Sequence, residues 1–375
     1  MNRYIEPDLD FITEIKANSG ENLKKCYQCA TCSVVCKLSS DEKPFPRKEM
    51  IYAAWGLKDR LIANPNIWSC YNCGDCSTYC PRGAMPGEVM GALRKMTIKE
   101  YARPSAMHKL VNDARMLPLL FFIPALVLLV MGAVTGMMDF HPEGDSIVFA
   151  HFFPVPLIEM IFIPLSMAVA LVFFFGLKRF ISDMKKTHAV LDGVKPESFK
   201  MDRFLKILFS NLSSIIRHKR FSICSENSGR KLSHMMVSFS FFSLAFVAGA
   251  FVFALYILNS HGPYSQINPI KILANVAGIS LIAGSLMMIR DRKANPQQTS
   301  TYFDWYLLGI SFCLGVTGML TQLIRLLDVP WAAYSMYFIH LVMVFNLIAL
   351  LPYTKLAHLV YRSVAQVFDI YTRAR

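Results

Sequence analysis

Beyond residue 110, long apolar runs alternate with short polar connections. An α-helix needs about 20 predominantly apolar residues to cross the hydrocarbon core of a bilayer, because each residue adds only about 1.5 Å. Six runs reach that length, and they predict six membrane-spanning helices at 118–138, 152–177, 234–258, 270–289, 303–325 and 332–352.

The connections between these runs predict the orientation of the chain. Among these connections, Lys and Arg residues occur on one side only, with thirteen in loop 178–232, three in loop 290–302, four in segment 353–375, and none in loops 139–151, 259–269 and 326–331. Because basic residues stay on the cytoplasmic side of a membrane, both termini are expected to be cytoplasmic.

The basic loop contains a second helical pattern, FKMDRFLKILFSNLSSIIRHKR. Its apolar side chains fall on one helical face, and basic residues flank them: Phe204, Leu205, Leu208, Leu212, Ile215 and Ile216. The pattern is typical of an interfacial helix lying on the inner leaflet. It equally fits a helix that docks on the protein's own cytoplasmic part.

The composition agrees with a membrane part and bears on the compartment. The chain is 54% hydrophobic and 17% charged, which is too apolar for an ordinary soluble domain. The net charge of +13 lies mostly in loops that flank apolar helices, which argues against nucleic acid as a partner. Eight of the ten cysteines lie in the first 80 residues, after a polar and acidic start without a secretory signal. A reducing compartment is therefore expected, where thiolates bind metal rather than form disulfides.

Those eight cysteines form two copies of one motif. CYQCATCSVVCK at 26–37 and CYNCGDCSTYCP at 70–81 share the spacing C-x2-C-x2-C-x3-C. Three thiolates at this spacing can wrap one face of a cubane cluster, and in two-cluster ferredoxins the fourth cysteine ligates the other cluster. On that pattern cluster one takes Cys26, Cys29, Cys32 and Cys80, and cluster two takes Cys70, Cys73, Cys76 and Cys36.

A zinc module is the alternative, since C-x2-C pairs also build zinc sites. Zinc takes four ligands, usually from two such pairs, whereas each copy here adds a third and a fourth cysteine. The doubled spacing favours two [4Fe-4S] clusters. The 33 residues between Cys36 and Cys70 have a helical pattern, so residues 1–110 are expected to be a cytoplasmic α-helical ferredoxin domain.

Histidines in membrane spans are costly and usually functional. His340 and His358 are eighteen residues apart, so on a straight helix they would share a face about 27 Å apart, although Pro352 intervenes. His234 opens the third span level with His358, and the two predict an imidazole pair for the iron of an inner haem. An outer haem at His340 needs a second ligand, for which His151 is favoured over His261. Glu159, in the second span, predicts a proton path or a quinone contact, with a helix-packing hydrogen bond as the alternative.

These motifs carry a resemblance to known families. The amino-terminal 110 residues resemble the iron–sulfur C subunit of heterodisulfide reductases, through both cassettes and NIWSCYNCGDCSTYCPRG. The remainder resembles the cytochrome b subunit of those enzymes and of respiratory nitrate reductase, through the paired histidines around LLPYTKLAHLV. Fusion of both halves is typical of the C subunit of the quinone-interacting membrane-bound oxidoreductase complexes.

The resemblance implies cofactors, partners and a location. It implies two [4Fe-4S] clusters, one or two b haems ligated by His234, His340 and His358, and menaquinone as substrate. It also implies soluble heterodisulfide reductase A-like flavin and iron–sulfur partners, a link to adenylylsulfate reductase in sulfur metabolism, and the cytoplasmic membrane of a prokaryote. The nitrate reductase cytochrome has a second histidine ten residues into its corresponding span, where this chain has Leu244.

The expected fold is therefore all-α. A two-cluster ferredoxin domain at 1–110 precedes a six-helix transmembrane cytochrome b bundle at 111–360 and a cytoplasmic tail at 361–375. The chain carries no dinucleotide fingerprint or nucleophile elbow, so flavin chemistry is assigned to partner subunits and activity is not expected from this chain alone. Two alternatives remain: a heterodisulfide-reductase-like or sulfite-reductase-linked membrane subunit with the same cofactors, and a membrane-anchored iron–sulfur sensor without haem.

Overall fold

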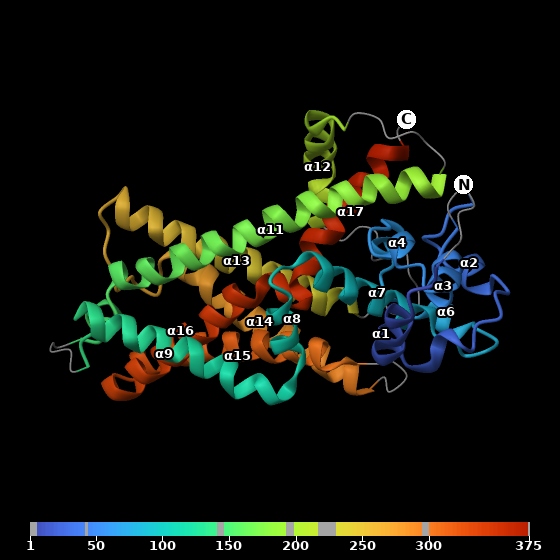
Figure 1. Cartoon of the computed structure of the whole chain (residues 1–375). Coiled ribbons are helices and arrows are strands. Elements are labelled where there is room, and N and C mark those ends of the chain that lie inside the picture. Colours follow the sequence, from blue (N-terminus) through green and yellow to red (C-terminus); the bar gives the residue numbers. More distant parts are fainter. Residues whose placement is uncertain are drawn as a thin grey trace.

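The computed structural model describes residues 6–41, 44–140, 146–192, 199–216, 230–294 and 300–373. Throughout these ranges the regular elements are helices, and none of the described residues forms a strand. The all-α prediction is confirmed (Figure 1).

The amino-terminal region consists of short helices that surround the cysteine motifs. The helices are α1 (Leu9–Ser19), α2 (Thr31–Val34), α3 (Arg47–Ala54), α4 (Lys58–Leu61), α5 (Asn66–Ser69), α6 (Asp75–Thr78), α7 (Pro86–Tyr101) and α8 (Ser105–Asn112). Local signals explain several ends: the Asp8 carboxylate accepts a hydrogen bond from the Phe11 amide, and Gly20 closes α1 with a positive φ. The interval between the cassettes is helical, as predicted.

Within the described residues, six helices are long and apolar enough to cross a membrane, as the sequence predicted. They are α9 (Leu117–Thr135), α11 (Val155–Asp192), α13 (Arg230–Tyr256), α14 (Pro269–Ala294), α15 (Tyr302–Leu326) and α16 (Pro330–Leu350), with the short α10 (Phe149–Phe152) before α11. Consecutive helices from α13 to α16 pack on one another, and α9 and α11 pack on α16.

Two boundaries differ from the sequence expectation. The second span continues as α11 to Asp192, fifteen residues into the predicted loop 178–232, because Phe180 and Met184 are fully buried against the cysteine-bearing region. His340 and His358 do not share one helix. Helix α16 ends at Leu350 and two 3-10 turns follow around Pro352, which lacks an amide hydrogen for the helical ladder.

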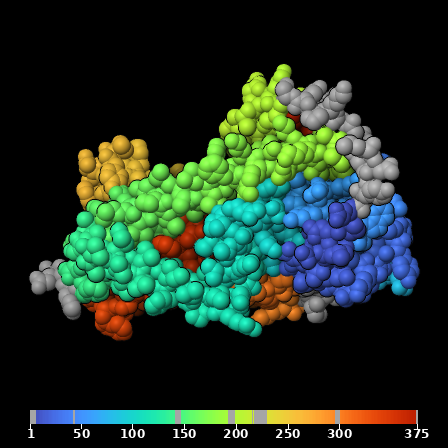
Figure 2. Space-filling view, in the orientation of Figure 1, coloured from blue at the N-terminus to red at the C-terminus, as the bar shows by residue number. Residues whose placement is uncertain are grey.

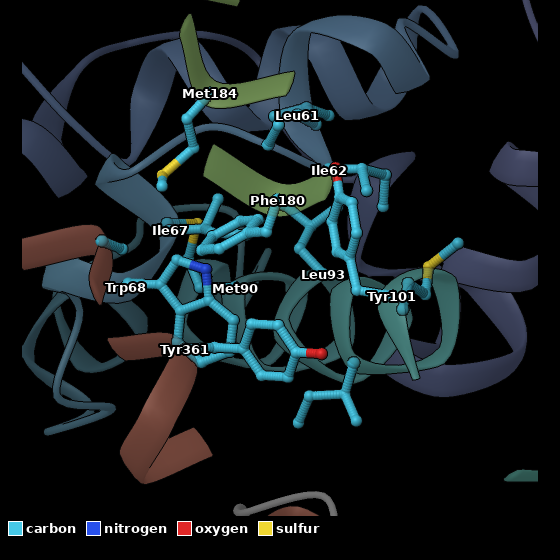
Figure 3. Packing of buried hydrophobic residues seen from close by; sticks show 14 of the residues in the cluster. Leu61, Ile62, Ile67, Trp68, Met90, Leu93, Tyr101, Phe180, Met184 and Tyr361 are labelled. Carbon is cyan, nitrogen blue, oxygen red and sulfur yellow. The ribbon is translucent and has the colours of Figure 1, made fainter. Parts of the chain in front are cut away.

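The predicted tail is a packed helix, α17 (His358–Arg373), that begins inside the predicted membrane domain. Its Tyr361 ring stacks on Trp68 of α5, with ring centres 6.0 Å apart. Trp68 also meets the edge of Phe180 from α11 (Figure 3). One buried core therefore joins the cysteine-bearing region to two of the long membrane-half elements.

Helix α12 (Met201–Ile216) covers the predicted amphipathic stretch. Phe204 is buried and contacts Tyr371 of α17 through ring packing, so one side of α12 docks on the protein itself. A second apolar strip is exposed, comprising Met201, Leu205, Phe209, Leu212 and Ile216. The helix lies at a steep angle to α11 and stands out from the surface (Figures 1 and 2). The docking interpretation is confirmed for the Phe204 side of the helix, and contact of the exposed strip with the inner leaflet remains a prediction. The side chain of Ile215 lies outside the described residues.

Candidate functional site: two cysteine nests beside a histidine-lined cavity

The two cysteine motifs fold into the same local backbone. Gln28 and Asn72, which precede the second cysteine of each copy, both have positive φ. Ala30 and Gly74, which precede α2 and α6, do so as well. These left-handed residues turn successive thiols toward a common centre, as ligation of one compact group requires.

The copies exchange their fourth cysteine. The pKa of the Cys32 thiol is raised to about 11, mainly by burial and also by Cys26, Cys29 and Cys80, because neighbouring thiolates repel one another. Burial also raises the pKa of Cys36, with added repulsion from Cys70 and Cys73 of the other copy. The structure therefore brings Cys80 to the first copy and Cys36 to the second.

The second set lines a cavity of its own. Its walls include Cys36, Cys70, Cys73 and Cys76. The Asn72 amide donates a hydrogen bond of 3.3 Å to the Cys70 sulfur, and the Ala84 amide donates one of 3.3 Å to the Cys80 sulfur. Hydrogen bonds to the ligand sulfurs are one of the features by which proteins tune iron–sulfur clusters. Among the described residues, no three His, Cys, Asp or Glu side chains are close enough to hold a single metal ion. A polynuclear cluster, which spaces its ligands more widely than zinc does, fits this donor set better.

A cavity of about 920 Å³ extends from the cysteine-bearing region into the membrane half. One face of α13 lines it at helical spacing, from His234 through Val237, Phe241 and Leu244 to Ala248. Helices α14, α15, α16 and the start of α17 supply further walls, together with α7 and Tyr71 and Asn72 of the second cysteine motif. The cavity therefore extends along much of the length of α13. His234, His340 and His358 all line it, whereas His151 does not.

His234 and His358 face one another across the end of this cavity that lies beside the second cysteine motif. This end is called the inner end below. Their ring centres are 6.3 Å apart and their planes are 83° apart. Two imidazoles on opposite sides of one metal ion would have their ligating nitrogens about 4 Å apart, twice a bond of about 2.0–2.1 Å, with ring centres farther out. The observed separation leaves room for an ion between the rings.

Hydrogen bonds set the tautomer of His358 and orient His234. The Nδ1 of His358 lies 2.5 Å from the Lys355 carbonyl oxygen, which can only accept, so Nδ1 carries the proton and Nε2 keeps its lone pair. The Ser238 hydroxyl lies 3.3 Å from Nδ1 of His234. Metal-ligating histidines are typically held in this manner through the nitrogen that does not bind the metal.

His340 is also held by a hydrogen bond at Nδ1, but among the described residues no second imidazole lies beside it. The Thr317 hydroxyl donates to the Cys313 carbonyl at 2.8 Å, so it accepts from Nδ1 of His340 at 2.9 Å. The free Nε2 is available to the cavity, which His340 lines. Among the described residues, the cavity walls contain only His234, His340 and His358 as histidines, and Leu244 stands on the α13 face.

The remaining predicted residues lie elsewhere. His151, in α10, and His261, after α13, are both exposed and outside the cavity walls, so the structure does not bring either to His340. Glu159 accepts a hydrogen bond of 2.5 Å from the Tyr256 hydroxyl. This hydrogen bond joins α11 to α13, as the alternative interpretation of Glu159 as a helix-packing residue predicts. A quinone contact at Glu159 remains a prediction.

Cationic side chains, which the sequence pattern did not reveal, line the inner end of the cavity. Arg230, Arg292 and Lys355 lie there, and both Arg292 and Lys355 pair with Asp304. Arg362 is half-buried and stacks over the Tyr71 ring at 4.6 Å. In the sequence these residues resemble ordinary basic flanks of membrane helices. Arg230 and Arg362 each lie four residues from a predicted ligand histidine, and this spacing was the sequence signal that could have identified them.

Comparisons with known proteins identify the first of the two regions. Residues 22–84 match the family described as 4Fe-4S dicluster domain. A heterodisulfide reductase C-like protein of Archaeoglobus profundus is 38% identical over 89 residues, 24% of this chain and 47% of that protein. The amino-terminal region resembles the C subunit of heterodisulfide reductase. The C subunit of the H(2):CoB-CoM heterodisulfide,ferredoxin reductase of Methanothermobacter marburgensis is 36% identical over 93 residues, 24% of this chain and 50% of that protein.

The chain spans about half the length of the curated relatives it matches. No solved structure was found to match it. The matches support iron–sulfur electron transfer in the heterodisulfide reductase C-like region. The six apolar helices are consistent with a multi-pass membrane protein.

Proposed function

We propose that this chain is the membrane-bound electron-transfer subunit of an oxidoreductase complex. It would carry electrons between the quinone pool and soluble partner subunits, with two [4Fe-4S] clusters near the cytoplasm and b haem in the membrane half. The observation that carries this proposal is the position of the His234–His358 pair beside the second cysteine set. Tyr71 and Asn72 line both the histidine-lined cavity and the cavity of that cysteine set. Redox groups at these positions would be neighbours.

The eight cysteines fit the clusters in number, type and convergence. We assign Cys26, Cys29, Cys32 and Cys80 to cluster one and Cys70, Cys73, Cys76 and Cys36 to cluster two. Repulsion among the converging thiolates is costly in the bare protein, and bound iron would relieve it.

The cavity fits haem through three properties. Its inner end offers two imidazoles with their Nδ1 atoms held, its walls along α13 are largely apolar, and Arg230, Arg292 and Lys355 could meet the acidic side chains of a haem. When bound, haem supplies one-electron transfer, which the side chains themselves cannot perform. His340 would be the protein ligand of an outer haem, for which the cavity offers one imidazole only.

The partners follow from the relatives' names and from what the chain lacks. The relatives are subunits of heterodisulfide reductases, so heterodisulfide reductase A-like flavin and iron–sulfur proteins are the proposed soluble partners. Menaquinone is the proposed membrane substrate and adenylylsulfate reductase the proposed terminal partner. A sulfite-reductase-linked complex is the alternative with the same cofactors.

A reduced-minus-oxidised spectrum of the purified chain, with iron and haem assays, tests the proposal. We expect haem bands together with about eight cluster irons per chain, as two cubane clusters require. A second step adds a menaquinol analogue and monitors haem reduction. Zinc with no iron would reject the relay and favour the zinc module, whereas iron without haem would reject the relay and favour the iron–sulfur sensor.

A further inference from the structure

Arginines one helical turn from each inner-haem histidine hold the same cysteine loop. Arg362, four residues after His358, donates a hydrogen bond of 2.7 Å to the Cys70 carbonyl oxygen. Arg230, four residues before His234, donates one of 3.1 Å to the Asn72 carbonyl oxygen. Residues four apart lie on the same side of a helix, so each histidine and its arginine approach this loop together.

A third arginine also binds this loop. Arg94 of α7 donates hydrogen bonds to the carbonyl oxygens of Ile67 at 3.0 Å and Cys70 at 3.2 Å. The Cys70 carbonyl therefore accepts from two guanidinium groups. Charged donors give stronger hydrogen bonds than neutral ones, so this segment of the loop is firmly fixed relative to α13 and α17.

The first copy of the motif has no such link to the cavity. Within the described part of the chain, no residue of 26–37 lines the histidine cavity. Cys29 is exposed, and Val34 of α2 is 83% exposed. Figure 1 places α2 at the end of the molecule away from the long helices.

We propose that the Cys70, Cys73, Cys76 and Cys36 cluster is the membrane-side member of the pair, and that Arg230 and Arg362 are the positioning residues that hold its loop against the His234–His358 site. This inference rests on the proposed function and adds to it the order in which electrons pass through the redox groups. Electrons leaving the clusters for the membrane pass from cluster one to cluster two and then to the inner haem, one at a time. Each donor is oxidised as its acceptor is reduced, with quinone as the final oxidant.

A rapid-mixing experiment on the purified full chain tests the order. The protein is fully reduced with dithionite, freed of excess reductant and mixed with an oxidised menaquinone analogue, and both clusters are followed by freeze-quench EPR. In Cys29→Ser, which removes a cluster one ligand, cluster two should be oxidised at the wild-type rate. In Cys73→Ser, cluster one should be oxidised far more slowly than in the wild type.

The opposite pattern would overturn the order. If cluster one of Cys73→Ser is oxidised as fast as in the wild type while cluster two of Cys29→Ser is slowed, cluster one is the membrane-side cluster. A wild-type chain that binds neither haem nor iron would instead reject the proposed function. The two failures are therefore distinguishable.

The arginines have a test that does not depend on turnover. Arg362→Gln removes a positive charge beside the Cys70 carbonyl, so the EPR-monitored midpoint potential of cluster two should fall while that of cluster one stays unchanged. Arg230→Gln should act in the same direction. Arg373→Gln is the matched control, because Arg373 lies on the same helix and pairs with Asp369 instead. Equal shifts of both clusters, or no shift of either, would remove the positioning role.

Discussion

The indole of Trp68 and the ring of Tyr361 stack at 6.0 Å with their planes 21° apart. Trp68 precedes the second cysteine motif by two residues, and Tyr361 follows His358 by three. Both side chains are fully buried. The cysteine region is therefore built into the membrane half through a shared core, which gives the two kinds of site a fixed separation.

Gly176 lies at the edge of this shared core, and its substitution should loosen it. A Cβ at Gly176 would lie 2.9 Å from the Tyr101 carbonyl oxygen and 2.9 Å from the Tyr361 hydroxyl. Because the nearest atoms include backbone, we expect Gly176→Ala to cost about 1–3 kcal/mol through overpacking. The loss would be measured as a lower melting temperature in detergent. Gly249→Ala is the control, since nothing lies within 4 Å of that Cβ. Equal melting temperatures for both variants would contradict the expectation.

The exchange of fourth cysteines predicts an outcome that sequence proximity would not. Cys36 belongs to the first motif, but Cys36→Ser should weaken the same cluster as Cys73→Ser and leave the cluster of Cys29 intact. The measurement compares the EPR spectra and iron contents of the three variants. If Cys36→Ser instead matches Cys29→Ser, each motif serves its own cluster.

The sequence predicted those features that arise from local signals. Apolar runs of bilayer length predicted six long helices, and the doubled spacing predicted the 4Fe-4S dicluster domain that residues 22–84 match. The features that were missed depend on tertiary packing. Helix α11 continues past residue 177 because Phe180 is buried against the cysteine-bearing region. Likewise, nothing near Arg362 in the sequence indicates that its side chain reaches the Cys70 carbonyl. His151 was favoured because it stands at the head of the second predicted span, on the outer side, but this position does not reveal the direction of its side chain.

Gly318 allows His340 to sit against α15, and enlarging it tests the role of that histidine. A Cβ at Gly318 would lie 3.0 Å from Cε1 of His340. Gly318→Ala should therefore displace the imidazole and change any haem spectrum to which His340 contributes. Gly309→Ala, on the same helix and with nothing within 4 Å, should leave the spectrum unchanged. Identical spectra for the two variants would mean that His340 does not ligate haem.

Glu49 gives the cysteine region a pH dependence. Burial raises the pKa of this carboxyl from 4.5 to about 7, although Asn66 donates to it at 3.2 Å. The folded state therefore holds the proton more tightly than the unfolded state. The free energy of unfolding should fall as pH rises from about 4.5 to 7, by roughly 3 kcal/mol at about 1.4 kcal/mol per pKa unit.

Glu49→Gln removes this titration while keeping the side-chain shape. We expect the variant to melt higher than the wild type at pH 8 and to lose most of that advantage at pH 5, as measured by thermal unfolding in detergent. A stability difference that is the same at both pH values would show that ionisation of Glu49 is not the cause.

The inner haem assignment depends most directly on His358. Its Nδ1 is committed to the Lys355 carbonyl, so Nε2 is the nitrogen left for iron, and no neighbouring side chain among the described cavity walls offers an equivalent imidazole to pair with His234. His358→Ala should therefore abolish the low-spin signal of the inner haem in the reduced-minus-oxidised spectrum, with the cluster signals retained. His151→Ala is the matched control: its imidazole is exposed and outside the cavity, so the spectrum should not change. An intact inner-haem spectrum in His358→Ala would transfer the ligand role to another residue. A loss of signal in His151→Ala would mean that α10 approaches the cavity in the loaded protein.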